Sequence, residues 1–401
     1  MGCGRWPVAQ GGFGGGGTGD GCAGGGGGGG YSGGDGGFIA GGGGSFNSGG
    51  NKEEAAGIGV GDGSVSIELA DNTPPVIVFT TVPSSLTNSP NSAFAFSANE
   101  PAMLTCALDG GVAAPCNTTA VDGWAAFSRL ADGVHSLTVF GVDAASNQSS
   151  VQYSWTIDTV APSLSTLDTL PNPSPINTAV SLSAKWAGAT GASYSVDGGG
   201  FTAMTLSNGT FAASLGAFTQ AGVHDVCVRG TDGAGNVSGS ACVLLAVFDP
   251  AAGFATGGGW IDSPEGAVAA DASLTGKATF GFVSRYQKGA TVPTGRTDFQ
   301  FQTANLAFHS TAYEWLVISG ARAQYKGSGT INGGGDYGFL LTAIDGAVLG
   351  GGARDRLRVK IWERATGAIV YDNQQSGDVS DTAEPATVVG GGNIVIHSGK
   401  K

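Results

Sequence analysis

Two stretches in the middle of the chain repeat each other, and this repeat limits the possible folds more than any other feature. ADGVHSLTVFGVDAASN (131–147) corresponds to QAGVHDVCVRGTDGAGN (220–236) at an offset of 89, and LDGG (108–111) corresponds to VDGG (196–199). A period near 88 residues is the size of one small domain. The chain therefore contains two copies of one folding unit.

Both copies consist of short alternating runs separated by turn residues. The runs are SAFAFSA (92–98), HSLTVFGV (135–142) and VQYSWTI (151–157) in the first copy, and AVSLSAKW (179–186), HDVCVRG (224–230) and CVLLAVF (242–248) in the second. No segment has helical periodicity. Six or seven strands with turn signals every 8–12 residues predict an antiparallel β-sandwich for each copy.

Prolines mark the joins between the parts of the chain. Pro74-Pro75, Pro162 and Pro250 lie where composition changes, as expected of short extended linkers. We therefore divide the chain into a glycine-rich segment (1–70), two sandwich domains (71–160 and 161–250) and a further β-rich domain (251–401).

The first sandwich unit resembles the bacterial immunoglobulin-like repeats of large secreted and surface proteins. The likeness is carried by residues 71–116, by LADGVHSLTVFGVDAASN (130–147) and by YSWTIDTVAP (153–162). The second unit shares the scaffold. The resemblance implies two tandem immunoglobulin-like modules that act as spacers or adhesive stalks and carry no chemistry of their own.

The N-terminal segment is dominated by glycine, which fills 27 of the first 50 positions. A phosphate-binding loop is excluded because no G-x-x-x-x-G-K-S/T string occurs. The spaced aromatic residues distinguish the segment from a plain Gly/Ser linker. GGGGSFNSGGNKEEAAGIGVGDGSVSIEL (41–69) resembles the C-terminal half of a glycine-rich module of bacterial surface proteins, which packs polyglycine helices. We expect a truncated module that is partly disordered.

The six cysteines fall into three local pairs, with no zinc-ligand spacing. Cys106 and Cys116, and likewise Cys227 and Cys242, link neighbouring candidate strands across a turn. These pairs predict disulfides and an oxidising, extracellular compartment. Cys3 and Cys22 form a third candidate pair. The first residues do not have the pattern of a signal peptide, so we expect the export signal to lie upstream of this chain.

The charge pattern argues against two classes of partner. The net charge is −13, with 18 acidic and 5 basic residues in 1–250 and 13 of each in 251–401. An acidic chain without a basic stripe is not suited to nucleic acid or to an anionic membrane surface. No apolar run is long enough to span a bilayer.

The C-terminal part is also rich in strands. RLRVKIW (356–362) alternates so that Leu357, Val359 and Ile361 face one side. Residues 254–267, 276–295, 299–346 and 355–374 belong together and resemble a C-terminal domain of secreted bacterial proteins that begins with T-G-G-G-W-I and carries G-K-A-x-F-G-F-V. The likeness covers nearly all of 254–397, and the resemblance implies no activity. We predict one more sandwich or barrel.

Aromatic residues of this C-terminal part are the main candidates for a ligand site. They could form a platform on which a sugar stacks, although aromatic residues also fill β-sandwich cores. The platform candidates are Trp260, Tyr313, Trp315 and Trp362. His309-Ser310 and Glu314 are neighbours, but we find no nucleophile elbow and no distinctive pair of carboxylates. We therefore expect no enzymatic activity and no catalytic residues.

Several turns contain Asp and Asn residues whose side-chain oxygens could bind calcium. The candidates are Asp143 with Asn147, Asp232 with Asn236, and Asp378 with Asp381. One Asp and one Asn cannot supply the six or more ligands that calcium takes, so Asx turns are favoured in the sandwiches and a solvated loop at 378–385. We expect no cofactor, with calcium as the alternative.

These features together suggest a non-enzymatic display or adhesion protein of the cell surface. Its partner would be a polysaccharide or a surface protein. The alternative is a carbohydrate-binding ancillary part of a secreted hydrolase. A hydrolytic C-terminal domain is the third hypothesis.

Overall fold

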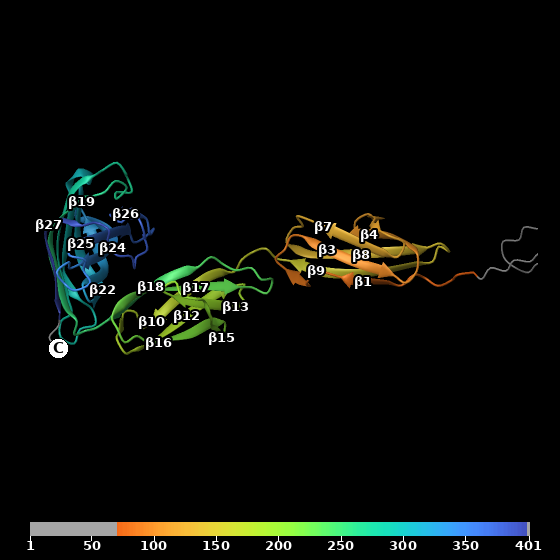
Figure 1. The fold of residues 1–401 in the computed structure, drawn as a ribbon, viewed down its shortest axis with the longest axis horizontal. Helices are drawn as coiled ribbons and strands as arrows, with labels where there is room; N and C mark the ends of the chain where they lie inside the picture. The colour runs from red at the N-terminus through yellow and green to blue at the C-terminus, as the bar shows by residue number, and fades with distance from the viewer. Residues whose placement is uncertain (1–69, 399–401) are drawn as a thin grey trace, which may run out of the picture. The chain divides into compact units, whose positions relative to one another are not determined.

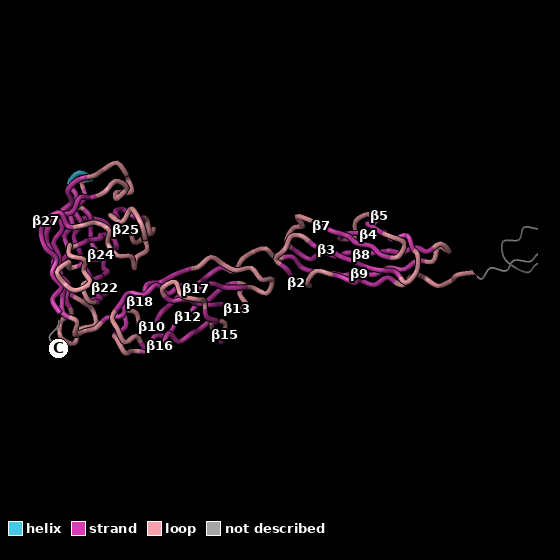
Figure 2. Tube along the Cα trace, viewed as in Figure 1, coloured by secondary structure: helices cyan, strands magenta, loops and turns pink. Residues whose placement is uncertain are grey.

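The computed structural model describes residues 70–398, and this part of the chain is built from β-strands (Figure 1). The only helical element among these residues is the short 3-10 turn η1 (Gln302–Ala304), the single helix colour in Figure 2. The predicted all-β class is confirmed. The glycine-rich module prediction and the Cys3–Cys22 pair lie outside the described residues.

The first repeat unit is a sandwich of two sheets. One sheet has the order β1-β3-β7-β6 and the other β2-β9-β8-β4-β5. The strands are β1 (Ile77–Thr81), β2 (Leu86–Thr87), β3 (Ser92–Ala98), β4 (Ala102–Leu108), β5 (Ala114–Pro115), β6 (Asn117–Thr118), β7 (Asp122–Phe127), β8 (Gly133–Asp143) and β9 (Gln148–Ile157).

The second unit repeats this arrangement with the orders β10-β12-β16-β15 and β11-β18-β17-β13-β14. Its strands are β10 (Ser163–Leu170), β11 (Ser174–Pro175), β12 (Ala179–Ala187), β13 (Gly191–Val196), β14 (Thr202–Ala203), β15 (Thr205–Ser207), β16 (Thr210–Ala217), β17 (Gly222–Thr231) and β18 (Ala241–Phe248). Each unit also has one short parallel pair, β2 with β9 and β11 with β18, because a two-residue strand joins the sheet opposite to that of the strand before it. All other strand pairs of the two sandwiches are antiparallel, as predicted.

Alternation in the sequence explains both sandwich cores. In β3, Phe94 and Phe96 are 2% and 1% exposed while Ala93 faces solvent. Side chains of successive strand residues point to opposite faces, so each sheet buries one face against its partner. Trp155 completes the first core, and Leu182 and Val226 lie in the second.

The C-terminal part is one curled antiparallel sheet with nine strands in the order β26-β25-β24-β23-β22-β21-β20-β19-β27. Its strands are β19 (Gly253–Ser263), β20 (Gly276–Arg285), β21 (Thr294–Phe301), β22 (Leu306–Ser319), β23 (Arg322–Ile331), β24 (Gly334–Ile344), β25 (Arg356–Glu363), β26 (Ile369–Asp372) and β27 (Val389–Ser398). Phenylalanines and aliphatic residues of β19 to β27 fill the inside of the curl as one core.

The carboxylates of the buried Asp345 and the half-buried Asp355 bond to the backbone of β27. Asp345 Oδ2 accepts a hydrogen bond from the Ile396 amide at 2.9 Å, and Asp355 Oδ2 accepts one from the Ile394 amide at 2.6 Å. These amides would otherwise be unpaired at a sheet edge, where buried donors are costly. The carboxylates therefore take the place of a neighbouring strand at these two positions.

Two β-bulges in β22 change which side chains face outward. The register with β23 shifts between Ser310 and Ala312 and again between Tyr313 and Trp315. Tyr313 consequently lies in the core inside the curl, whereas Trp315 joins a separate cluster on the outer face. A bulge inserts one residue and so reverses the alternation beyond it.

The outer cluster connects the second sandwich to the C-terminal sheet. Ala246 and Phe248 of β18 pack with Trp315, Val317 and Leu340, and all five are at most 4% exposed. The Phe248 ring stacks on Tyr286 with a centroid distance of 4.7 Å. Burial raises the pKa of Tyr286 to about 12, although its hydroxyl accepts a hydrogen bond from the Leu316 amide.

Candidate functional site

A cleft of about 710 Å³ lies beside this cluster, on the outer face of β22 to β25. Its volume is within the range of small-ligand sites. Strand register places its floor: Trp315 pairs with Lys326, Lys326 with Leu340, and Leu340 with Lys360. These four residues form one row across four strands, so the floor of the cleft is a direct consequence of sheet pairing.

Trp362 is the aromatic residue of the cleft that remains partly exposed. It pairs with Gly338 on β24, and a Cβ added to Gly338 would lie 2.4 Å from the indole ring. A glycine at this position therefore lets the indole lie against the sheet. Lys326 Nζ stands 5.9 Å from the centre of the Trp362 ring. The result is a supported aromatic surface with a cation beside it.

The charged residues of the cleft are paired. Lys326 Nζ lies 3.0 Å from Glu314, and Lys360 Nζ lies 2.6 Å from Asp381. Their formal charges sum to zero. The four groups present ammonium donors and carboxylate acceptors along the cleft.

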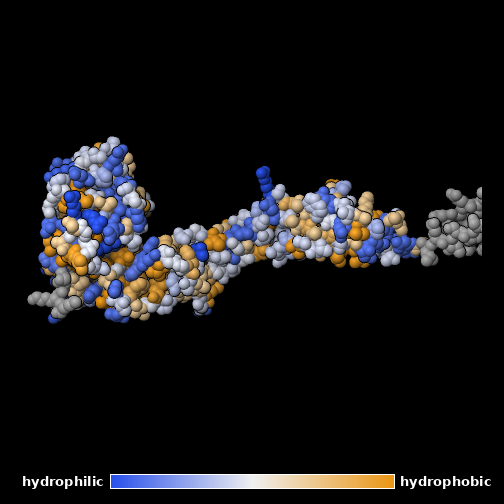
Figure 3. Space-filling view, in the orientation of Figure 1, coloured by the Kyte–Doolittle hydropathy of each residue, from blue (hydrophilic) through white to orange (hydrophobic). Residues whose placement is uncertain are grey.

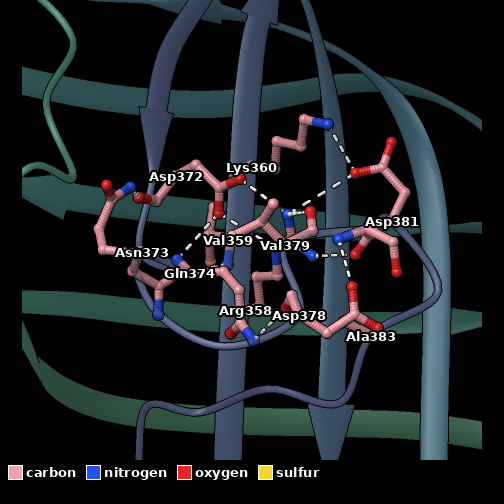
Figure 4. Close-up of polar contacts among 12 residues, drawn as sticks. Arg358, Val359, Lys360, Asp372, Asn373, Gln374, Asp378, Val379, Asp381 and Ala383 are labelled. Carbon is pink, nitrogen blue, oxygen red and sulfur yellow. Dashed lines mark hydrogen bonds and ion pairs between the residues drawn. The ribbon is translucent and has the colours of Figure 1, made fainter.

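Asp381 lies in the loop between β26 and β27, and this loop is held in place by polar contacts with the sheet (Figure 4). The buried Arg358 donates to both carboxylate oxygens of Asp372 and to the Val379 and Ser380 carbonyl oxygens. Gln324 Nε2 donates to the Asp381 carbonyl oxygen at 2.6 Å. A bidentate guanidinium–carboxylate pair is among the more rigid polar contacts in proteins. The loop therefore fixes the acidic side of the cleft.

The second sandwich supplies another wall. Asn172, Pro173 and Leu244 border the cleft. Asn172 Nδ2 donates to the Leu244 carbonyl oxygen at 2.8 Å, and Asn172 Oδ1 accepts from the Ala246 amide at 3.1 Å. These two bonds tie the loop before β11 to β18, the strand next to β11 in the sheet.

The predicted platform residues do not all meet. Tyr313, Trp315 and Trp362 border the cleft, but Tyr313 and Trp315 are only 8% and 4% exposed, because the first lies in the core and the second lies under Phe248. Trp260 lies apart from the cleft on β19, with Lys277 Nζ 4.6 Å from its ring centre. Of the four candidates, Trp362 is the one that borders the cleft and is partly exposed.

Lys326 and Lys360 were not singled out from the sequence. The alternation of RLRVKIW contains the signal for Lys360, because Lys360 and Trp362 must face away from Leu357, Val359 and Ile361. The contribution of Leu244 has no such signal, since it comes from a different part of the chain.

The calcium candidates of the sandwiches form closed turns. Asp143 accepts hydrogen bonds from the Asn147 amide and side chain at 2.8 Å each, and Asp232 accepts from the Asn236 amide and side chain at 2.9 Å each. Burial raises the pKa of Asp143, but the hydrogen bonds outweigh it and the pKa is lowered. The side-chain bond from Asn236 lowers that of Asp232. Both carboxylates are already satisfied by Asx-turn donors.

The two calcium candidates of the loop at 378–385 also have hydrogen-bond or ion-pair partners. Asp378 accepts a hydrogen bond from the Ser380 amide at 2.8 Å, which lowers its pKa, and Asp381 pairs with Lys360.

The two sandwiches each contain the predicted disulfide. Cys106 is bonded to Cys116, and Cys227 to Cys242. The second bridge crosses between paired positions of β17 and β18, and Cys242 borders the cleft. Both bonds are consistent with an oxidising compartment.

The described residues include no helix of the length and apolarity needed to cross a membrane. On the face seen in Figure 3, hydrophilic and hydrophobic residues are interspersed. Large exposed apolar side chains such as Trp124 and Met103 lie in the first sandwich.

No family model and no curated protein match this chain. Among solved structures, the fibronectin(III)-like modules of Clostridium thermocellum CbhA match with a TM-score of 0.30 and 15% identity, covering 43% of this chain and 94% of theirs. A structure of a 1.5-MDa bacterial ice-binding adhesin matches with a TM-score of 0.27 and 12% identity, covering 69% of this chain and 94% of that one. An ICAM-5 D1–D4 ectodomain fragment matches with a TM-score of 0.26 and 15% identity, covering 56% and 75%. The chain thus has distant structural matches to fibronectin-III-like and immunoglobulin-like modules.

Proposed function

We propose that this chain is a non-enzymatic, extracellular display or adhesion protein. The cleft on the C-terminal sheet is its recognition site, and the β-sandwiches are spacers, the second of which also borders the cleft. The observation that carries the proposal is the cleft itself, with the indole of Trp362 set among two ordered ion pairs. A rigid concave site of this kind suits ligand binding.

The arrangement of the acids supports binding rather than hydrolysis. Glu314 and Asp381 each have a lysine partner. The general acid of a glycosidase must instead hold a proton, and its second carboxylate must face the first across the scissile bond. The disulfides support the extracellular location.

The test is a binding screen of the full chain against polysaccharides and surface proteins, with two tryptophan variants. We expect Trp362→Ala to weaken binding by about tenfold or more, because it removes the exposed aromatic surface of the cleft. The matched control is Trp124→Ala, since Trp124 is 55% exposed on the first sandwich and outside the cleft. Equal binding by Trp362→Ala and the unaltered chain would contradict the proposal, as would release of reducing sugar ends during incubation.

The second candidate function is that of a carbohydrate-binding ancillary part of a secreted hydrolase. The exposed indole beside paired charges favours it, because sugar rings stack on aromatic faces while their hydroxyls bond to polar neighbours. It predicts that fusion to a hydrolase raises turnover of insoluble polysaccharide, and that Trp362→Ala abolishes this gain.

A further inference from the structure

We propose that the cleft binds a neutral saccharide and that the second sandwich forms an indispensable wall of the site. This inference rests on the recognition role proposed above. It specifies the ligand class and the parts of the chain that must act together.

The charge balance of the cleft selects against an acidic ligand. Both lysines already have carboxylate partners, at 3.0 Å for Lys326 and 2.6 Å for Lys360. A ligand carboxylate or sulfate would either share an ammonium group with Glu314 or Asp381 or displace that acid. Both arrangements cost free energy, because the first sets like charges side by side and the second leaves a half-buried acid without its cation. A neutral ligand keeps both pairs.

Acidic groups beyond the cleft act in the same direction. Asp225 of β17 is partly buried, and its carboxylate lies within 4.8 Å of the Cys242 sulfur, which borders the cleft. Burial, followed by the carboxylates of Asp197 and Asp381, raises the pKa of Asp225. A further carboxylate on this side of the cleft adds to the penalty for an anionic ligand.

The hydrogen-bonding groups and the aromatic surface of the cleft suit a ligand that carries hydroxyl groups. The Trp362 indole offers an apolar face, the carboxylates of Glu314 and Asp381 accept hydrogen bonds, and the two ammonium groups donate them. Sugars present hydroxyls that both donate and accept around an apolar ring face. A neutral saccharide therefore satisfies every group of the cleft without leaving a charge unpaired.

The wall that the second sandwich contributes is held in place by buried packing and by hydrogen bonds. Leu244 lies two residues before Ala246, which is fully buried against the C-terminal sheet in the cluster of Trp315, Val317 and Leu340. The hydrogen bonds of Asn172 to Leu244 and Ala246 attach the loop before β11 to β18. Leu244 thus contributes an apolar surface to the same cleft whose floor contains Lys326 and Lys360.

The experiment is calorimetric titration of the full chain with matched hexasaccharides. The neutral probes are β-1,4-glucan and β-1,4-xylan hexamers, and the acidic probe is a hexagalacturonate. We expect a neutral probe to bind with an affinity that changes less than about twofold between about 20 mM and about 500 mM NaCl, because charge attraction would be screened over that range. The acidic probe should bind at least about tenfold more weakly.

Two variants test the walls separately. Trp362→Ala and Leu244→Ala should each reduce neutral-probe affinity by about fivefold or more, with Trp124→Ala and Leu206→Ala as controls outside the cleft. Retained melting temperature checks that each variant is folded, and Trp362→Phe should recover part of the affinity because it keeps an aromatic face.

The outcomes separate this inference from the proposed function. Preferential binding of the acidic probe, binding of no neutral probe, or an unaffected Leu244→Ala overturns the inference. If Trp362→Ala nevertheless loses binding to an acidic or protein ligand, the recognition role stands. If Trp362→Ala binds every ligand as well as the unaltered chain does, both fail.

Discussion

At the scale of single residues, the two sandwiches differ in how they hold an equivalent histidine. His135 Nδ1 bonds to Asp109 at 2.8 Å, and its Nε2 lies 2.8 Å from the Ala131 carbonyl oxygen. His224 has the same contact with Asp197 at 2.7 Å, but its buried Nε2 has no hydrogen-bond partner among residues 70–398. An imidazolium satisfies both contacts of His135, since both of its nitrogens then donate.

These contacts predict that the stability of the first sandwich depends on pH. The Ala131 carbonyl and the Asp109 carboxylate raise the pKa of His135 above 6.5. For Asp109, burial raises the pKa, but the hydrogen bonds from His135 and Ser136 outweigh it and the pKa falls below 3.8. The His135 contribution to stability is therefore complete below pH 6.5 and is lost as pH rises through its folded pKa. The Asp109 contribution is present above pH 3.8 and is lost as pH falls.

We predict that His135→Gln lowers the melting temperature of the first sandwich more at about pH 5.5 than at about pH 8.5. The reason is that the imidazolium form makes the stabilising contacts. Thermal denaturation followed across this pH range measures the difference. An equal loss at both pH values would show that the ring contributes through packing on Trp155, which lies 5.6 Å away between centroids, and not through its charge.

At the scale of secondary-structure elements, the bulges of β22 shape both faces of the C-terminal sheet. Gly327 of β23 pairs with Tyr313 next to the second bulge. A Cβ at Gly327 would lie 2.2 Å from the Ala312 carbonyl oxygen and 2.8 Å from the Phe339 ring. The backbones can approach here only because this position has no side chain.

We predict that Gly327→Ala lowers the free energy of unfolding by about 1–3 kcal/mol, because the added methyl overpacks the site. Urea denaturation of the full chain measures the change. Gly334→Ala is the matched control, since a Cβ at Gly334 meets nothing within 4 Å. Similar stability of the two variants would mean that β22 and β23 separate at little cost and that the bulge does not depend on this glycine.

These elements show how far the sequence predicts the site. RLRVKIW places Lys360 and Trp362 on one face by alternation alone, and β25 bears this out. The same reasoning applied to Tyr313 and Trp315 puts them on one face, but the bulge separates them. A bulge depends on how two strands pair, so it has no local sequence signal as clear as alternation.

At the scale of the whole described chain, the second sandwich and the C-terminal sheet share a buried cluster. Phe248 is 2% exposed and stacks on Tyr286, while Trp315 and Leu340 complete the contact. Burial of large apolar side chains couples the stability of the elements that share them. The cleft lies beside this cluster, so its shape depends on the same contact.

We predict that Phe248→Ala lowers stability by about 3–5 kcal/mol and separates the unfolding of the two parts. Calorimetry of the full chain should show their shared transition resolving into two. Phe201→Ala is a control, because Phe201 lies in the second sandwich at 36% exposure. A single unaltered transition in Phe248→Ala would mean that this cluster does not couple the parts.

The sequence by itself determined the all-β class, the two-fold repeat and the two disulfide pairs, because alternation, turn residues and local cysteine spacing are short-range properties. Only the tertiary structure decided where the site lies. It brought Leu244 and Asn172 beside Trp362, Lys360 and Asp381, turned Tyr313 inward, and left Trp260 apart. The physical reason is that strand register, bulges and packing between sheets arise from contacts between distant residues, and alternation along one strand contains no information about its neighbours.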